Sequence, residues 1–97
     1  MVWMIWFEDK RGRILTLTNE RIKHIGFHMS LHDKHHLIEE ILKSPDIFSQ
    51  DEEQPETAHY QGYLRQENIY LIIVAKLFNG EGFIITIYKS KKPKVIQ

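Results

Sequence analysis

The hydrophobic pattern at the start of the chain is typical of two short β-strands. Bulky apolar side chains dominate residues 2–8. Along residues 13–17, Arg13 and Leu15 alternate with Ile14 and Thr16. Each pattern predicts one strand. The polar residues 9–12 between them predict a turn, in which Gly12 can adopt a positive φ.

Two helices are predicted next. Thr18 has the side chain of an N-cap residue, and we expect the helix that it starts to continue to His28. Asp33 is the predicted N-cap of the second helix. This second helix has an apolar stripe at helical spacing, formed by Leu37, Ile38, Ile41 and Leu42. We expect it to end before Pro45, because the residue that precedes a proline is pushed out of the helical region.

The second half of the chain is predicted to be β-structure. In chain order, the predicted strands are 46–49, 58–65, 69–78 and 83–89. The last two are apolar on both faces, as in central strands, and the sequence at 79–82 predicts that a hairpin turn joins them. Gly62 is expected to mark a β-bulge, and the acidic residues 50–57 to form a loop.

These elements predict an α+β fold in which two N-terminal helices pack on one face of a twisted, four- to five-stranded antiparallel sheet. A length of 97 residues suits one domain, 1–97, with residues 90–97 as a flexible basic tail. The chain has no cysteine, so disulfides and a cysteine nucleophile are excluded. No apolar run is long enough for a membrane helix, and the first residues lack the basic leader of a signal peptide. We therefore expect a soluble, cytoplasmic protein with no membrane partner.

Charge is segregated along the chain although the net charge is zero. Residues 10–36 carry six basic and two acidic groups, residues 37–67 two basic and eight acidic groups, and residues 68–97 five basic and one acidic group. If the two basic segments meet in space, they form a positive face of the kind that binds nucleic acid. The alternative is ordinary solvated surface charge.

Histidine is the most unusual component of the sequence, with six copies in 97 residues. His24 and His28 are four positions apart and would share one face of a continuous helix. They could form an acid–base pair, a metal pair, or neither. A third ligand could come from the histidines that follow at 32, 35 and 36, but no known zinc spacing is matched. We expect no metal and no other cofactor.

Hydroxyl and basic side chains gather toward the end of the last predicted strand. Alternation groups Thr86 and Tyr88 with Ile84 and Ser90 on one face and leaves Lys89 on the other. Histidines, hydroxyls and a lysine are the groups that metal-independent RNA cleavage requires. A base takes the proton of the ribose 2′-OH, an acid protonates the leaving 5′-oxygen, and a cation stabilises the charged phosphorane. The alternative is a strand chosen for packing, followed by a solvated tail.

Four segments together resemble the phage-type barnase–EndoU–colicin–RelE nuclease families, several members of which are proposed ribonuclease toxins. The segments are Leu15-Thr16 with Glu20 to Ile25 and His28, then Ile38 to Asp46, Tyr70 to Lys76, and Gly82 to Lys89. The resemblance covers about residues 13–92. It implies two helices on a four-stranded antiparallel sheet, with an RNA-cleaving site between the sheet and the first helix. Where the family pattern commonly reads Arg-His-Pro-Glu, this chain reads Phe-His-Met-Ser at 27–30.

The resemblance implies a metal-independent endoribonuclease of the RelE-like toxin type, with RNA as substrate and a cognate antitoxin as partner. The implied catalytic residues are His24, His28, Thr86, Tyr88 and Lys89. The basic residues expected to bind RNA phosphates are Arg21, Lys91 and Lys92. Two alternatives stay open. One is a non-catalytic module that binds RNA or protein through exposed aromatic side chains, namely Trp3, Trp6, Tyr60 and Tyr63. The other is a histidine-based metal protein.

Overall fold

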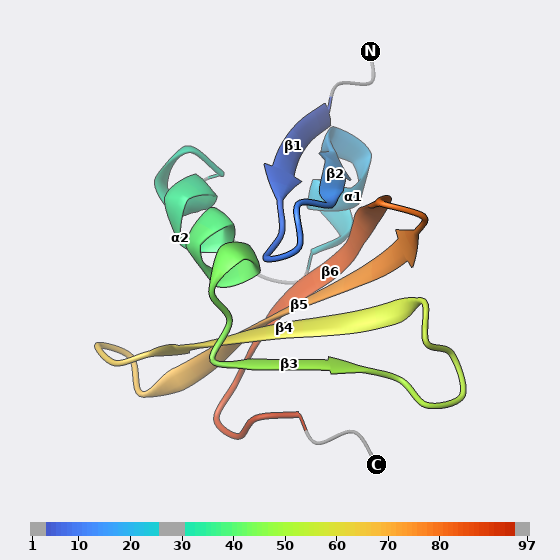
Figure 1. The fold of residues 1–97 in the computed structure, drawn as a ribbon. Helices are drawn as coiled ribbons and strands as arrows, with labels where there is room; N and C mark the ends of the chain where they lie inside the picture. Colours follow the sequence, from blue (N-terminus) through green and yellow to red (C-terminus); the bar gives the residue numbers. More distant parts are fainter. Residues whose placement is uncertain (1–3, 26–30, 95–97) are drawn as a thin grey trace.

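Strands and helices follow one another along the chain in nearly the predicted order (Figure 1). The structure is a computed structural model that describes residues 4–25 and 31–94. Its elements are β1 (Met4–Glu8), β2 (Ile14–Thr18), α1 (Asn19–His24), α2 (Leu31–Lys43), β3 (Ile47–Gln50), β4 (Thr57–Leu64), β5 (Ile69–Phe78) and β6 (Glu81–Ser90). Neither described helix is long and apolar enough to cross a membrane.

The strands form one six-stranded sheet in the order β1-β2-β6-β5-β4-β3. Neighbouring strands are antiparallel except for β2 and β6, which pair in parallel over 14–16 and 81–83. The predicted fold class, with two N-terminal helices on a four- to five-stranded antiparallel sheet, is therefore wrong. The sheet is larger and mixed, and two strands precede both helices. Side-chain alternation identifies a strand but does not name its neighbour, and β2 pairs with the strand that is most distant along the chain.

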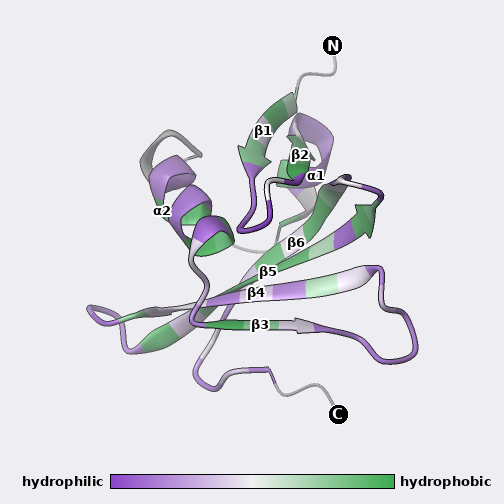
Figure 2. Ribbon diagram, viewed as in Figure 1, coloured by the Kyte–Doolittle hydropathy of each residue, from purple (hydrophilic) through white to green (hydrophobic). Residues whose placement is uncertain are grey.

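Both helices cover the same face of the sheet, which we call the helix face (Figure 1). The apolar side of α2 turns toward the sheet, as Figure 2 shows, and its side chains Ile38, Ile41 and Leu42 are buried in the core. This confirms the predicted stripe. At Gly62 of β4, a Cβ atom would lie 2.5 Å from Cγ1 of Ile41, so glycine allows α2 to approach the strand. The β4–β5 register runs through Gly62 without a shift, so the bulge predicted there is wrong.

The irregularity of the sheet lies in β6 instead. Its register with β5 shifts between Val74 and Ala75, which leaves Ile85 as an extra residue. An extra residue changes which side chains share a face. As a result, Ile84 is buried in the core under the helices, whereas Thr86 faces the other side of the sheet. The prediction that Ile84 and Thr86 share a face is wrong for this reason.

The helix boundaries depart from the predicted ones. Thr18 is the N-cap of α1 as expected, and its hydroxyl accepts a hydrogen bond from the backbone N–H of Arg21. The helix ends at His24, because Ile25 has an extended backbone with φ −74° and ψ 122°. The prediction that the helix runs through Ile25 is therefore wrong, and His28 lies outside the described residues. Helix α2 begins at Leu31, so Asp33 lies inside its first turn and is not the N-cap.

The central hairpin is confirmed. Strands β5 and β6 pair along their lengths and occupy the middle of the sheet. Asn79 and Gly80 form the turn and both have positive φ, 25° and 87°. Their sequence is a common hairpin signal because glycine and asparagine tolerate this conformation.

Neither of the two described helices packs on the second face of the sheet, and we call it the open face. Residues 91–94, the C-terminal segment, cross it on the side opposite the helices (Figure 1). The side-chain amide of Gln61 donates to the Lys94 carbonyl at 2.9 Å and accepts from the Lys94 N–H at 2.8 Å. The predicted flexible tail is thus held at Lys94, and residues 95–97 lie outside the described part of the chain.

Candidate functional site

The predicted residues of β6 divide between the two faces of the sheet. Thr86 and Tyr88 lie on the open face, where they pair across the strands with Val74 and Ile72. Tyr88 is half-buried, and burial raises the pKa of its phenol. Lys89 lies on the opposite side, as alternation predicts, and its Nζ is 2.8 Å from Oε1 of Glu67. Lys89 therefore does not join the two hydroxyls.

A lysine that sequence reasoning missed lies on the same face as the hydroxyls. Lys76 follows Val74 by two positions on β5, so its side chain shares the open face with Thr86. It is half-buried and pairs across the strands with Phe83. Period-two alternation could have found it, since Lys76 is the polar position of an otherwise apolar strand.

The structure describes only part of the predicted histidine pair. The backbone of His24 ends α1, its side chain is not described, and His28 lies outside the described residues. Because α1 ends at His24, the shared helix face that motivated the pair is not present. Two other histidines are described on α2. The ring of His35 contacts the ring of Phe7 in a tilted arrangement, with centroids 4.9 Å apart and an angle of 35° between the planes. The His35 and His36 rings are 5.9 Å apart.

The three predicted RNA-binding residues lie at two places in the fold. Arg21 is exposed in the first turn of α1, which contacts β2 and β6. Lys91 and Lys92 are exposed just after β6. Lys92 is tied to the strand end, since its carbonyl accepts from the Ser90 hydroxyl at 2.6 Å.

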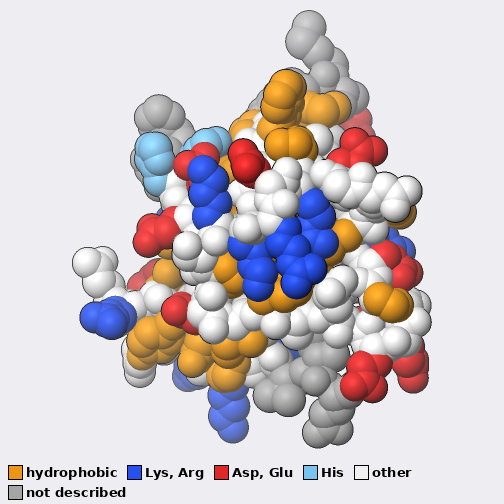
Figure 3. Space-filling model, viewed as in Figure 1, with side chains coloured by type: hydrophobic (Ala, Val, Ile, Leu, Met, Phe, Trp, Pro, Cys, Tyr) orange, Lys and Arg blue, Asp and Glu red, His pale blue; other side chains and the backbone are white. Residues whose placement is uncertain are grey.

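A second basic surface, which sequence reasoning treated as an ordinary turn, is built on residues 9–13. We call this segment the basic turn. Figure 3 shows Lys and Arg side chains gathered around it at the centre of one face, with the histidines of that view over α2. Lys10 Nζ lies 4.3 Å from the Phe48 ring centroid, and the Lys10 N–H donates to the Leu42 carbonyl at 2.9 Å. Arg11 is exposed beside it.

Asp9 holds the basic turn in place. Its carboxylate is buried and accepts four hydrogen bonds, from the backbone N–H groups of Arg11 and Arg13, from Arg13 Nε at 2.8 Å, and from the Tyr60 hydroxyl at 2.7 Å. Burial raises the pKa of the Asp9 carboxyl, but the hydrogen bonds together lower it by more than burial raises it. The pKa of Asp9 therefore lies below its usual value. Burial and the bond to Asp9 both raise the pKa of Tyr60. The ion pair with Asp9 fixes the guanidinium of Arg13. The Nη2 atom of Arg13 is buried without a hydrogen-bond partner among the described residues.

A different polar group is buried on the open face, two positions before Gln61 on β4. His59 is 4% exposed, and its Nδ1 has no hydrogen-bond partner within the described chain. The hydroxyl of Ser49, its neighbour across the β3–β4 pair, also lacks one. Burial lowers the pKa of His59, Lys94 lowers it further, and Asp51 partly opposes both.

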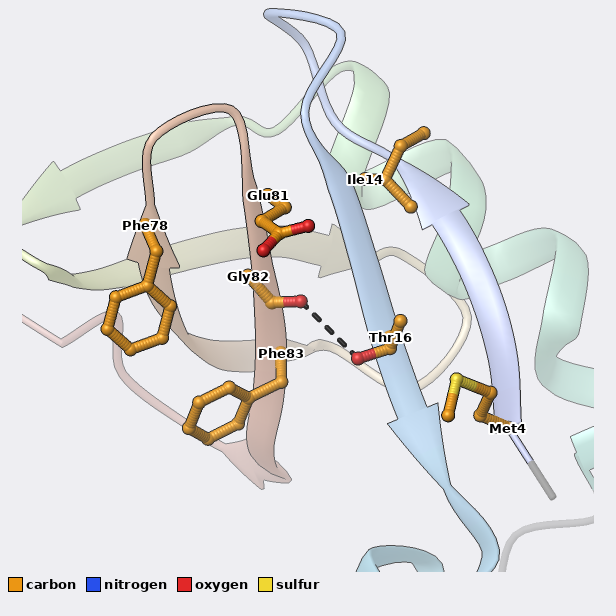
Figure 4. Close-up of a pocket in the computed structure, with 7 residues that line it drawn as sticks. All are labelled: Met4, Ile14, Thr16, Phe78, Glu81, Gly82 and Phe83. Atoms are coloured by element: carbon orange, nitrogen blue, oxygen red, sulfur yellow. Dashed lines mark hydrogen bonds between the residues drawn. The ribbon is translucent and has the colours of Figure 1, made fainter.

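An apolar groove opens at the other end of the open face, where β1, β2, β5 and β6 meet. It has a volume of about 410 Å³ and is lined by Met4, Ile14, Thr16, Phe78, Glu81, Gly82 and Phe83 (Figure 4). The rings of Phe78 and Phe83 stack with centroids 5.8 Å apart. The Thr16 hydroxyl is turned to the Gly82 carbonyl at 3.4 Å, so it does not face the groove as a free donor.

Among the side chains that the structure describes, which do not include those of His24, His32 and Asp33, no group of three or more His, Cys, Asp or Glu is arranged to hold a metal ion. No protein-family model, curated protein or solved structure matches this chain.

Proposed function

We propose that this protein binds RNA through the basic turn and cleaves it as a metal-independent endoribonuclease. The observation that carries the proposal is the rigid basic turn on the same face as the histidines of α2 (Figure 3). The resemblance to nuclease toxins supports the proposal. A protein of that toxin type would also have a cognate antitoxin as a partner. Thr86 and Tyr88 lie on the opposite, open face of the sheet, so this proposal gives them no part in positioning the phosphate.

The turn suits a phosphate backbone because its cations are held in place before any ligand binds. Residues 9–13 carry three basic side chains and one carboxylate. Asp9 neutralises Arg13, so Lys10 and Arg11 supply the charge that a phosphate would meet. Lys10 is further restrained by the Phe48 ring. Side chains that are already ordered lose less entropy on binding.

The histidines suit the chemistry because imidazole exchanges protons near neutral pH. His24 and His28 remain the proposed base and acid. His35 and His36 add two imidazoles near the basic turn, since Lys10 is bonded to Leu42 and His36 lies about 9 Å before Leu42 along the helix. The ribose 2′-OH would attack the adjacent phosphate, which leaves a 2′,3′-cyclic phosphate and a 5′-hydroxyl.

The test uses a labelled single-stranded oligoribonucleotide and purified protein in the presence of a chelator. We expect cleavage to a cyclic phosphate, and no cleavage of an oligonucleotide with 2′-hydrogen at the scissile position. His24→Ala or His28→Ala should slow the reaction by ~10²–10⁴. Activity that depends on added zinc or manganese would contradict the metal-independent mechanism.

Binding is tested separately with the double variant Lys10→Ala, Arg11→Ala. If both side chains contact phosphates, the slope of log affinity against log salt should decrease by roughly 1.4, that is 0.7 for each contact with a single strand. Arg65→Ala is the matched control, because Arg65 is an exposed cation at the β4–β5 turn. Equal effects of the two changes would show that the basic turn is not the RNA site.

A second candidate is a non-catalytic binding module, favoured by the exposed groove on the open face. Such a module would bind RNA or protein without cleaving it. RNA binding that depends on Lys10 and Arg11, with no cleavage by wild type, would favour this candidate over the nuclease.

A further inference from the structure

Exposed large hydrophobic side chains concentrate at one end of the open face. Among the described residues six such side chains are exposed, and five of them lie on the strands around the groove. These five are Met4 (52% exposed), Trp6 (68%), Ile14 (38%), Phe78 (48%) and Phe83 (37%). Scattered exposed hydrophobics need no explanation, but a contiguous patch on a sheet face marks a surface that binds something.

The strand register gives the order of side chains across this patch. One row runs Trp6, Thr16, Phe83 and Lys76 across β1, β2, β6 and β5. The next row runs Glu8, Ile14, Glu81 and Phe78 across the same strands. The patch therefore has an apolar middle, two carboxylates in one row, and a half-buried lysine at one side.

This composition fits a protein surface better than a nucleic acid. Carboxylates in the floor of an RNA site would repel phosphates, and Glu81 lines the groove itself. The aliphatic side chains Met4 and Ile14 add apolar area without offering a ring for a base to stack on.

The charges and rings of the Trp6 row are complementary to those of the same row in a second copy, whereas the Glu8 row would set its carboxylates against apolar side chains of the partner. Trp6 and Lys76 lie at opposite ends of one row, three strand spacings or about 14 Å apart, so they cannot meet within one molecule. A two-fold axis parallel to the strands, between β2 and β6, places Trp6 over the partner's Lys76, and Lys76 over the partner's Trp6. Each contact would be a cation–π pair.

We infer that the groove end of the open face is a face-to-face interface between two copies of this chain. The two-fold arrangement also sets Phe83 against the partner's Thr16, and it makes a sandwich of two sheets about 10 Å apart. The chain has no net charge, so two copies do not repel one another at long range. This inference does not rest on RNA binding or cleavage.

The test is sedimentation of the full chain from about 1 µM to about 1 mM, a range that spans weak and moderate dissociation constants. Wild type should reach twice the monomer mass within this range. Trp6→Lys should raise the dissociation constant at least about 30-fold, because tryptophan is a typical interface hot spot and the new lysine meets the partner's Lys76. Adding Lys76→Glu to Trp6→Lys should restore the dimer, since the two new side chains are opposite in charge.

Tyr63→Lys is the matched control, because Tyr63 is the sixth exposed hydrophobic side chain, 39% exposed, and lies on β4 away from the groove. Circular dichroism checks that each variant folds, and Phe83→Asp is a second interface variant should Trp6→Lys misfold. A wild type that stays monomeric at the highest concentration overturns the inference. So does a dimer that loses no affinity in Trp6→Lys and Phe83→Asp. Oligoribonucleotide binding that is lost in Phe83→Ala, without any dimer, would assign the face to RNA instead.

Discussion

Two buried polar side chains on opposite faces of the sheet differ in their hydrogen bonding. One is hydrogen-bonded to a carboxylate, and the other has an atom without a partner among the described residues. Tyr60 and His59 are consecutive residues of β4, so their side chains point to opposite faces. On the helix face, the Tyr60 hydroxyl donates to Asp9, whose carboxylate accepts four hydrogen bonds. On the open face, the Nδ1 atom of His59 and the hydroxyl of Ser49 have no hydrogen-bond partner in the part of the chain that the structure describes.

The hydrogen bonding of the two groups has different consequences for the two faces of the sheet. A fully hydrogen-bonded carboxylate fixes the chain around it, and here it fixes the basic turn. A buried polar atom without a partner costs free energy, because it has given up its bond to water. Near His59 on the open face, Gln61 holds the C-terminal segment by two hydrogen bonds to Lys94, whose charge lowers the pKa of His59.

The largest expected effect is the loss of the Asp9 carboxylate. Asp9→Ala should lower the free energy of unfolding by about 3–5 kcal/mol, because it leaves a buried guanidinium and the Tyr60 hydroxyl without their partner. Urea denaturation measures the change. Glu8→Ala removes the neighbouring exposed carboxylate and should change stability by less than about 0.5 kcal/mol. Similar losses of unfolding free energy in both variants would mean that the hydrogen bonds to Asp9 stabilise the fold no more than an exposed carboxylate does.

The next effect is a dependence of stability on pH through His59. Its pKa is lower in the folded chain than in the unfolded chain, so the unfolded state binds the proton first as the pH falls below about 6.5. Stability should therefore decrease on acidification from neutral pH, by at most about 1.4 kcal/mol per pH unit from this group. In His59→Gln this part of the decrease should disappear. Thermal unfolding of both proteins between about pH 7 and pH 5 isolates it from the other histidines. An unchanged pH dependence in the variant would contradict the depressed pKa.

The smallest effect is expected at Ser49. Because its hydroxyl has no partner among the described residues, Ser49→Ala removes an unsatisfied group and should leave stability unchanged or raise it by up to about 1 kcal/mol. Tyr60→Phe removes a hydroxyl that donates to a carboxylate and should cost about 1.5–3 kcal/mol. If Ser49→Ala costs as much as Tyr60→Phe, a partner such as an ordered water satisfies the open-face hydroxyl, and the contrast between the two faces fails.

Local signals in the sequence were enough to locate most elements. The apolar runs on each side of Asn79 and Gly80 predict the central hairpin, because such runs have few alternatives to a buried strand. Thr18 was identified as an N-cap from its side chain alone, since the capping bond is made within three residues. The stripe on α2 was equally clear from its spacing.

Features that depend on distant contacts were not predictable from one sequence. Nothing local in β2 indicates that its neighbour is β6, and nothing in β6 indicates that Ile85 is the extra residue. Of the candidate site, alternation correctly placed Thr86 and Tyr88 together and Lys89 apart from them. Asp9 was missed because a carboxylate in a polar turn is normally solvated, and only the packing of Tyr60 makes it a buried acceptor.

The parallel pairing of β2 with β6 also bears on how the molecule assembles. Ile14 pairs with Glu81, so this contact closes a loop of 67 positions, whereas the β5–β6 hairpin closes through a turn at Asn79 and Gly80. Long loops are slow to close because much chain entropy is lost before any contact forms. We expect β3 to β6 to fold first as a meander, with the N-terminal hairpin docking last. Until that step Asp9 has no Tyr60 to bind and the groove has only one wall, so the basic turn and the proposed interface would become complete together.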